Sequence, residues 1–310
     1  MIKNFSPGSL GINGRQSELI ELALTYGFKG MDVDMQEMLR RAQRSEGGIA
    51  DASKYLDAAK KQFDIKIGGF DLGINLDADE DAFVAAVGAL HPVADLAKQL
   101  GAARAYCKLP AATDRLPYHE YFEAQTARLR QIAEVLGARD IKLGIGFSAG
   151  KELAEGKEFP FVRNVEGFVS LVKGVGSGAG FYVDTWDWVV GEGAMDQISE
   201  LSVDQIVAVR LCSLTPEADP AKAQSFERVV PEADGLLNHV KLVAHLASIG
   251  FEGPISPGAH GKSYKGQTRE SIVQAAQEAI DGIFTEAGLE VEALPKDTIE
   301  DIPYDPTPVM

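Results

Sequence analysis

The stretch LGARDIKLGIGF, residues 136–147, contains the end of one helix-like run and the whole of the next strand-like run. In the preceding run, YFEAQTARLRQIAEVL (121–136), apolar residues stand three or four positions apart, which is typical of an amphipathic helix. Gly137 follows at the place where a left-handed residue often ends a helix. IKLGIGF (141–147) is short and apolar, as expected of a buried strand. The stretch therefore predicts a helix joined to a strand by a short turn.

A glycine in the same place, after a helix-like run and before a strand-like run, recurs along the chain in YGFKG, LGAARAY and IGFEGP. Strands that alternate with helices predict a parallel sheet with right-handed crossovers, and eight such units in a chain of this length fit a single (β/α)8 TIM barrel over residues 1–285. Residues 286–310 are acidic and contain prolines, so we expect a C-terminal extension that wraps the surface or is partly disordered. The eight strand-like segments are residues 5–12, 27–35, 64–70, 103–109, 141–147, 179–185, 205–214 and 253–258. The clearest helix-like segments are residues 17–27, 54–63, 79–100, 121–136, 238–250 and 270–284.

The charge balance narrows the function classes. The 310 residues carry a formal net charge of −16, which argues against a nucleic-acid partner because phosphate binding needs a basic face. The N-terminus lacks the apolar run of a signal peptide, and no run of about 18 apolar residues occurs. We therefore expect no membrane segment and a cytoplasmic location, while the oligomeric state is not indicated.

In a TIM barrel the active site lies where the strands end, so the residues that follow each strand are the candidates. GFYVDTWDW, residues 180–188, ends in Asp184 and Asp187 and contains the only two tryptophans, Trp186 and Trp188. Carboxylates beside large aromatic rings are typical of a ligand pocket, although a packing cluster at the edge of the core has the same composition. The other strand ends offer Asp32, Asp34, Asp71, Lys108, residues 146–148, residues 210–213 and residues 256–262.

GFYVDTWDW, the segment from residue 116 to 146 and the ending GFEGPISPG resemble the xylose-isomerase-like barrels of the sugar isomerase and epimerase superfamily. The resemblance runs from residue 5 to about residue 285. It implies a divalent metal, manganese, magnesium or zinc, held by two glutamates, an aspartate and a histidine from the last four strands. In that family the metal binds the sugar, and the two glutamates move a proton between neighbouring carbons.

Most of this ligand set is missing here. Gly146 and Gly258 stand where the two glutamates are expected, and Arg210 stands in place of the histidine within the seventh strand. In the Asp-x-x-His pattern of the sixth strand, Asp187 replaces the histidine. Only Asp184 matches, so we expect no metal at the family site. An arginine there repels a cation, and we expect Arg210 to form an ion pair with Asp184 or Asp187 in place of the metal.

The resulting hypothesis is a divergent isomerase/epimerase-like protein with a pocket for a sugar or polyol. Trp186 and Trp188 would stack on the sugar, and Arg228 and His260 would contact it from nearby loops. If catalysis persists, Asp184 or Asp187 would act as the base while Arg210 polarises a carbonyl.

Three alternatives stay open. An active isomerase or epimerase would hold a relocated divalent metal through Asp184, Asp187 and His260, joined by Asp34 or Asp71. A non-catalytic protein would bind a carbohydrate or regulate a partner. The run GFSAG (146–150) also matches the nucleophile pattern of serine hydrolases, with Ser148 as nucleophile and His239, His245 or His260 as base.

Overall fold

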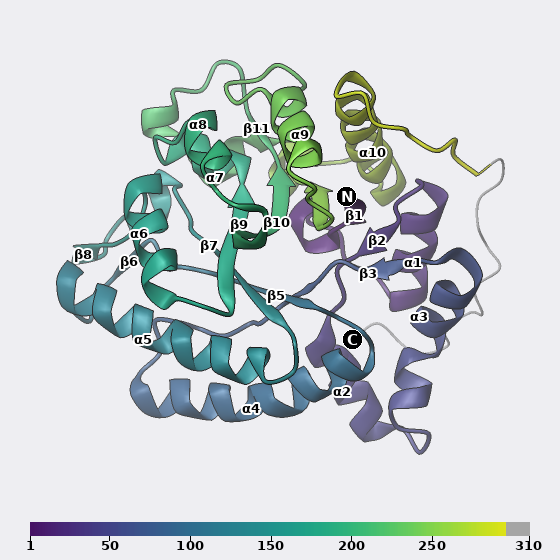
Figure 1. Cartoon of the computed structure of the whole chain (residues 1–310), viewed down its shortest axis with the longest axis horizontal. Helices are drawn as coiled ribbons and strands as arrows, with labels where there is room; N and C mark the ends of the chain where they lie inside the picture. Colours follow the sequence, from purple (N-terminus) through teal and green to yellow (C-terminus); the bar gives the residue numbers. More distant parts are fainter. Residues whose placement is uncertain (296–310) are drawn as a thin grey trace.

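Nine strands form one curled parallel sheet in the computed structural model, which describes residues 1–295. In spatial order they run β3-β2-β1-β13-β10-β9-β7-β5-β4 (Figure 1). The two outermost strands, β3 and β4, are halves of a single strand position separated by Gly68 and Gly69. Because β3 pairs with β2 and β4 pairs with β5, the chain itself closes the sheet into eight strand positions. The predicted single (β/α)8 barrel is therefore confirmed. The strands are β1 (Ile2–Phe5), β2 (Gly30–Met31), β3 (Lys66–Ile67), β4 (Phe70–Asp71), β5 (Arg104–Lys108), β7 (Lys142–Gly146), β9 (Ala179–Asp184), β10 (Ile206–Leu211) and β13 (Pro254–Pro257).

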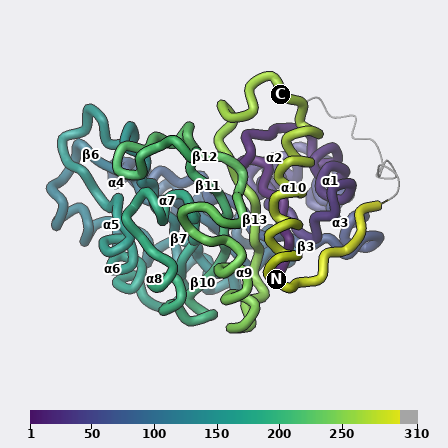
Figure 2. The backbone as a smooth tube through the Cα atoms, turned by 90° about the horizontal axis from the view of Figure 1, so that it is seen from above, coloured from purple at the N-terminus to yellow at the C-terminus, as the bar shows by residue number. Residues whose placement is uncertain are grey.

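The helices surround this sheet, and the last of them, α10, lies beside the start of the chain (Figures 1 and 2). Two short antiparallel pairs lie outside the main sheet, β6 (Ala112–Thr113) with β8 (Phe159–Pro160), and β11 (Ser213–Leu214) with β12 (Arg228–Val229). The six helices expected from the sequence are present as α1, α3, α4, α5, α9 and α10. The helices are α1 (Gln16–Thr25), α2 (Met35–Arg44), α3 (Ile49–Phe63), α4 (Glu80–Gln99), α5 (Tyr118–Gly137), α6 (Val165–Val175), α7 (Thr185–Val190), α8 (Met195–Ser199), α9 (His239–Ser248) and α10 (Arg269–Glu286). None of these helices has the length and apolar character that crossing a bilayer requires.

The first predicted strand is misplaced and the second is too long. The first was expected at residues 5–12, but β1 ends at Phe5 and a 3-10 helix follows at Pro7–Leu10, since a proline cannot donate to a strand ladder. The second was expected at residues 27–35 and covers only Gly30–Met31. Asp34 instead caps α2, where its side chain accepts a hydrogen bond from the Glu37 backbone N–H at 2.8 Å.

The helix-ending glycines are confirmed at three of four places. Gly27, Gly101 and Gly250 adopt left-handed conformations, with φ of 66°, 78° and 76°. Gly137 is instead the last residue of α5, and Asp140 takes the left-handed conformation with φ of 60°. Aspartate tolerates this conformation better than most residues, so the turn forms without a glycine.

Alternation along the strands decides which side chains reach the barrel interior. In β9, Phe181 points outward and packs edge-on against Phe168 of α6, with ring centroids 5.5 Å apart. Tyr182 points inward and stacks on Tyr106 of β5, with centroids 4.6 Å apart. Because successive residues of a strand face opposite sides, Asp184 also points inward, at the carboxyl end of the barrel.

The described part of the C-terminal extension lies against the first elements of the barrel. Leu289 and Val291 are partly buried against the core, and Glu292 forms an exposed ion pair with Lys29 at 2.6 Å. Residues 296–310 of the predicted extension lie outside the described residues.

Candidate functional site

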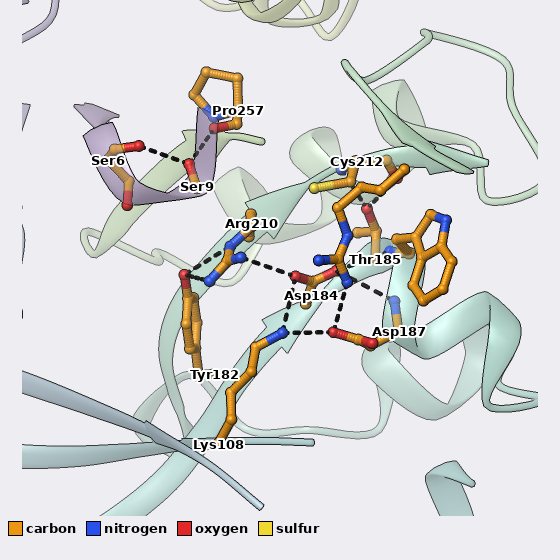
Figure 3. A network of polar contacts seen from close by, with 12 residues as sticks. Ser6, Ser9, Lys108, Tyr182, Asp184, Thr185, Asp187, Arg210, Cys212 and Pro257 are labelled. Carbon is orange, nitrogen blue, oxygen red and sulfur yellow. Dashed lines mark hydrogen bonds and ion pairs between the residues drawn. The ribbon is translucent and has the colours of Figure 1, made fainter. Parts of the chain in front are cut away.

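Three inward-facing side chains meet at the carboxyl end of the barrel. They are Lys108 at the end of β5, Asp184 at the end of β9, and Arg210 near the end of β10 (Figure 3). Arg210 lies directly opposite Asp184 in the parallel ladder of β9 and β10. This end of the barrel, lined by these residues, is called the barrel mouth below.

Asp187 and Arg228 complete the charged group from outside the sheet. Asp184 caps the short helix α7, its Oδ1 accepting hydrogen bonds from the backbone N–H groups of Trp186 and Asp187 at 3.1 and 3.2 Å. This cap places the Asp187 side chain beside that of Asp184. Arg228 reaches both carboxylates from β12.

The three cations hold the two carboxylates unequally. Asp187 Oδ2 lies 2.7 Å from Lys108 Nζ and 2.8 Å from Arg228 Nη2. Asp184 lies 3.6 Å from Lys108, 3.5 Å from Arg210 and 3.5 Å from Arg228. The ion pair expected between Arg210 and Asp184 is thus present, although Lys108 and Arg228 make the shorter contacts and make them to Asp187. Asp184 Oδ2 is buried and accepts no hydrogen bond from any described residue.

The charges around Asp184 keep it ionised. Burial by itself would raise the pKa of Asp184, but Arg228, Lys108 and Arg210 outweigh burial and lower that pKa below its ordinary value. A carboxylate stabilised in this way is a weak proton acceptor near neutral pH. The geometry therefore favours electrostatic binding by Asp184 over action as a general base.

The two short side-chain hydrogen bonds of Arg210 go to an uncharged group. Its Nε and Nη2 donate to the Tyr182 hydroxyl at 2.8 and 2.5 Å, and its guanidinium carbon lies 5.0 Å from the centre of the Tyr182 ring. Tyr182 is not among the residues predicted from the sequence to belong to the site. The two-residue period of β9 was the available signal, since Tyr182 stands two residues before Asp184 and faces the same side.

Asp32 adds a second carboxylate region to the barrel mouth, at the end of β2. Its Oδ1 accepts a hydrogen bond from the Asn4 amide at 2.9 Å. Burial raises the pKa of Asp32 to about 6, against the opposing effect of hydrogen bonds from Ser6 and Asn4 and of the Arg210 charge. Asp32 was among the residues expected at strand ends, but nothing in the sequence distinguished it from the others.

Neither tryptophan is available to stack on a ligand, so both assignments need correction. Trp186 is only 1% exposed, and the Arg228 guanidinium covers its ring at 4.6 Å from the centroid. Trp188 is fully buried, packs edge-on against Phe168 and donates its indole N–H to the Ala194 carbonyl at 3.0 Å. Residues two apart on a helix point about 200° apart, so α7 sends the two rings to different places.

The remaining predicted residues are dispersed. His260 caps a short 3-10 helix, its Nδ1 accepting from the Lys262 backbone N–H at 3.2 Å, and its own backbone N–H donates to the Arg228 carbonyl at 2.9 Å. Asp71 is exposed and accepts a hydrogen bond from the Gly73 backbone. Ser148 has no hydrogen bond to any histidine within residues 1–295, and His239 is bound to Thr185 and to the Glu232 carbonyl. The structure therefore assembles no Ser-His pair of the kind that a hydrolase needs.

The donor set at the barrel mouth does not fit a divalent metal. Within residues 1–295, no three His, Cys, Asp or Glu side chains are grouped closely enough to hold a metal ion. The space for a fourth ligand is also taken, because a Cβ added at Gly258 would lie 2.8 Å from Arg210 Cδ and from Cys212 Sγ. Arginine and lysine side chains supply hydrogen-bond donors and positive charge. A metal cation instead needs lone-pair ligands and negative charge.

A cleft of about 330 Å³ lies beside the barrel mouth. Its charged lining residues are Lys151, Arg163 and Glu192, and Ala149 forms part of its wall. The Ala149 backbone N–H donates to Asp187 Oδ1 at 3.0 Å, so the cleft and the charged group share a wall. The volume is within the range of small-molecule sites.

Comparisons with known proteins agree with this architecture. The sequence model of the xylose isomerase-like TIM barrel family matches residues 20–286. A xylose isomerase domain protein from Alicyclobacillus acidocaldarius is 21% identical, with a TM-score of 0.78 over 93% of this chain and 99% of that one. The IolI protein, solved with a zinc atom, is 15% identical with a TM-score of 0.75 over the same shares. D-psicose 3-epimerase from Clostridium cellulolyticum H10, solved with D-tagatose, is 14% identical with a TM-score of 0.67, again over 93% and 99%.

These solved structures establish the fold, and no curated protein sequence matches the chain. The family match covers most of the residues and spans the barrel from α1 to α10. The chain therefore belongs to the xylose isomerase-like TIM barrel family.

Proposed function

We propose that the chain binds a small sugar or polyol derivative at the barrel mouth without a divalent metal. The observation that supports this proposal is the contact of Lys108, Arg210 and Arg228 with Asp184 and Asp187. A metal would have to displace three cations from two carboxylates, which is unfavourable on charge alone. The D-psicose 3-epimerase structure contains a sugar, and the related fold motivates the ligand class proposed here.

The charged group offers hydrogen-bond donors to the oxygens of a sugar. Lys108 and Arg210 carry N–H groups at the barrel mouth, and their side chains are 29% and 14% exposed. Asp184 Oδ2 has no hydrogen-bond partner among the described residues, but it is buried behind these cations, so the donors are what an approaching ligand meets first. His260 would contact the ligand from the loop that follows β13, as proposed from the sequence.

Binding without proton transfer is favoured over an isomerase reaction that uses Asp184 or Asp187 as base. Both side chains are only 2% exposed, and each is surrounded by at least two cations. A base that removes a proton from carbon must be able to hold that proton. A carboxylate in ion pairs gives up its attraction to the neighbouring cations when it is protonated, so protonation is unfavourable.

Elemental analysis and calorimetry test the proposal. Protein purified without chelator is expected to hold far less than one manganese, magnesium or zinc per chain and to show no heat on titration with these ions. Neutral and acidic sugars and polyols are then screened by thermal shift, and Lys108→Met is expected to weaken the best ligand by about tenfold or more. Lys173→Met is the control, because Lys173 lies exposed on α6. One metal per chain, lost on Asp184→Asn, would show instead that the metal-dependent site has moved.

A further inference from the structure

The charges of the ion-pair group at the barrel mouth do not balance. In this group two carboxylates, Asp184 and Asp187, meet three cations, Lys108, Arg210 and Arg228. Asp32 also lies at the barrel mouth but forms none of these ion pairs, so the group itself has one positive charge in excess, in a protein whose overall formal charge is −16. A buried or half-buried charge without a partner is costly, so a ligand that supplies the missing negative charge gains this energy on binding.

Solvent reaches the cations and not the carboxylates. The side chains of Asp184 and Asp187 are each 2% exposed, whereas Lys108 is 29%, Arg210 14% and Arg228 11% exposed. An approaching molecule therefore meets N–H donors before it meets carboxylate oxygens. This arrangement suits an acceptor-rich, negatively charged group.

Arg210 is the cation whose charge is least neutralised. Lys108 and Arg228 each lie within 2.8 Å of Asp187. Among residues 1–295, Arg210 approaches no carboxylate closer than 3.5 Å, and its two short hydrogen bonds go to the uncharged hydroxyl of Tyr182. A guanidinium that is fixed by two hydrogen bonds to one hydroxyl presents its remaining N–H groups in a fixed direction, which favours an oxyanion.

From these contacts we infer that the ligand of the barrel mouth is anionic, a sugar acid or a sugar phosphate, with Arg210 as the principal partner of its carboxylate or phosphate group. The inference rests on the proposed binding function and names its ligand class. Carboxylate and phosphate share the chemistry that the site recognises, namely several acceptor oxygens around one negative centre.

Asp32 opposes anion binding. It lies close enough for Arg210 to influence its ionisation, and Asp71 is the other carboxylate that acts on it. A bound anion and an ionised Asp32 would repel each other and compete for the charge of Arg210. Replacing Asp32 with asparagine therefore removes a competitor and keeps the hydrogen bond from Asn4.

Calorimetry with matched ligands tests the inference. At pH 7.5 and 50 mM salt, D-gluconate or D-sorbitol 6-phosphate is expected to bind at least about tenfold more tightly than D-sorbitol, and the same order is expected for D-glucuronate or D-glucose 6-phosphate against D-glucose. Raising the salt to 500 mM should weaken only the acidic ligands. Each neutral ligand is thus compared with one carboxylate and one phosphate. The affinities of these two acidic ligands show which group the site prefers.

The outcomes separate the inference from the proposed function. Equal or tighter binding of the neutral ligands would overturn the anionic class and keep the binding site. Absence of binding heat and of thermal shift with all six ligands would overturn the binding function itself.

Two variants locate the charge effect. Arg210→Gln can still bond Tyr182 but lacks the charge, so the preference for the acidic ligand is expected to fall to within about threefold. A folded Arg210→Gln protein that keeps the tenfold preference would overturn the role of Arg210. Asp32→Asn tests the same charge balance without removing an ion pair. It should increase the affinity for the acidic ligand severalfold and leave the affinity for the neutral ligand unchanged. An unchanged ratio of the two affinities in Asp32→Asn would contradict the inference.

Discussion

Gly258 and Arg210 share one small volume at the barrel mouth. A Cβ at Gly258 would come within 2.8 Å of Arg210 Cδ and Cys212 Sγ, which is closer than real Cβ atoms approach other heavy atoms. Gly146, the other glycine at which the resemblance implies a glutamate, has more room. Its added Cβ would lie 3.4 Å from Lys108 Cγ and 3.5 Å from the Tyr182 carbonyl oxygen, which are ordinary contacts.

We therefore expect Gly258→Ala to lower the free energy of unfolding by about 1–3 kcal/mol, as overpacking usually does, and Gly146→Ala to change it by less than about 1 kcal/mol. Urea denaturation measures both. The cost of Gly258→Ala should shrink when Arg210→Ala is also present, because the longer side chain is then gone. An equal cost in both backgrounds would show that Arg210 is not the obstacle.

The raised pKa of Asp32 predicts a pH dependence of stability. The folded state holds the proton more tightly than the unfolded state, so this group favours folding most below about pH 4, and its contribution is lost as the pH rises through about 6. Asp32→Asn should thus be more stable than the parent protein at pH 8, by about 1 kcal/mol for a partly exposed group, and equal to it near pH 4.

Unfolding midpoints of Asp32→Asn and the parent protein between pH 4 and 8 measure this effect. Asp95→Asn is the control, because Asp95 accepts a hydrogen bond from Arg139 at 2.7 Å and its removal should give no gain at pH 8. Parallel curves for Asp32→Asn and the parent would contradict the predicted effect.

At the scale of elements, Thr185 joins three parts of the chain. Its hydroxyl accepts a hydrogen bond from the Cys212 backbone N–H at 2.8 Å and lies 2.8 Å from the Cys212 carbonyl, at the end of β10. It also lies 3.0 Å from Nε2 of His239, the first residue of α9. His239 Nδ1 faces the Glu232 carbonyl and must carry a proton there, so Nε2 of the neutral ring is an acceptor, and it shares the single Thr185 hydroxyl proton with the Cys212 carbonyl. Burial lowers the pKa of His239 and keeps the ring neutral.

Thr185→Val should lower the free energy of unfolding by about 2 kcal/mol, since it leaves buried polar groups of Cys212 and His239 without partners. Thr185→Ser keeps the hydroxyl and should cost about 1 kcal/mol or less. Thermal denaturation of the two variants measures the difference. Similar losses for both would mean that the methyl group, and not the hydroxyl, stabilises this junction.

The elements differ in how well the sequence predicts them. Long amphipathic helices such as α4 and α5 carry their own periodic pattern, so they were located closely. Strands β2, β3 and β4 have only two residues each, too few for a pattern, and tertiary pairing defines them. α7 was read as part of a strand end because Asp184 ends one element and caps the next, and this error placed both tryptophans wrongly.

The site was only partly predictable for a related reason. Asp184 and Arg210 stand out because they lie at the ends of apolar strands, where Asp184 keeps the pattern implied by the family resemblance and Arg210 departs from it. Lys108 was among the strand-end residues, but its pairing with Asp187 depends on a neighbour 79 positions away. Contacts over such distances follow from the barrel geometry and not from any local signal.

At the scale of the whole molecule, the barrel closes at Gly68 and Gly69. A Cβ at Gly69 would lie 2.4 Å from the Tyr106 ring, and one at Gly68 would lie 2.1 Å from the Asn4 side chain. Because these glycines lack side chains, the strand position formed by β3 and β4 fits against the Asn4 and Tyr106 side chains. It pairs with β2 through β3 and with β5 through β4. The count of eight units was predictable from the sequence, whereas the break in this strand was not.

Gly69→Ala should therefore lower the free energy of unfolding by about 3 kcal/mol and broaden the transition, because it strains the closure of the sheet. Gly88→Ala is the matched control. Gly88 lies exposed inside α4 with nothing near its added Cβ, so this change should raise stability by about 0.5–1 kcal/mol. Calorimetric unfolding compares the two variants. An unchanged free energy of unfolding in Gly69→Ala would show that the Tyr106 ring moves aside without destabilising the fold.

The shared volume of Gly258 and Arg210 also makes substitutions at these two positions depend on each other. A larger side chain at position 258 needs space that Arg210 now fills, so it is accommodated only where position 210 already carries a smaller residue. The same two substitutions therefore have different consequences in the two orders. Changing position 210 first opens the space, whereas changing position 258 first creates a clash, so one order is open and the other is obstructed.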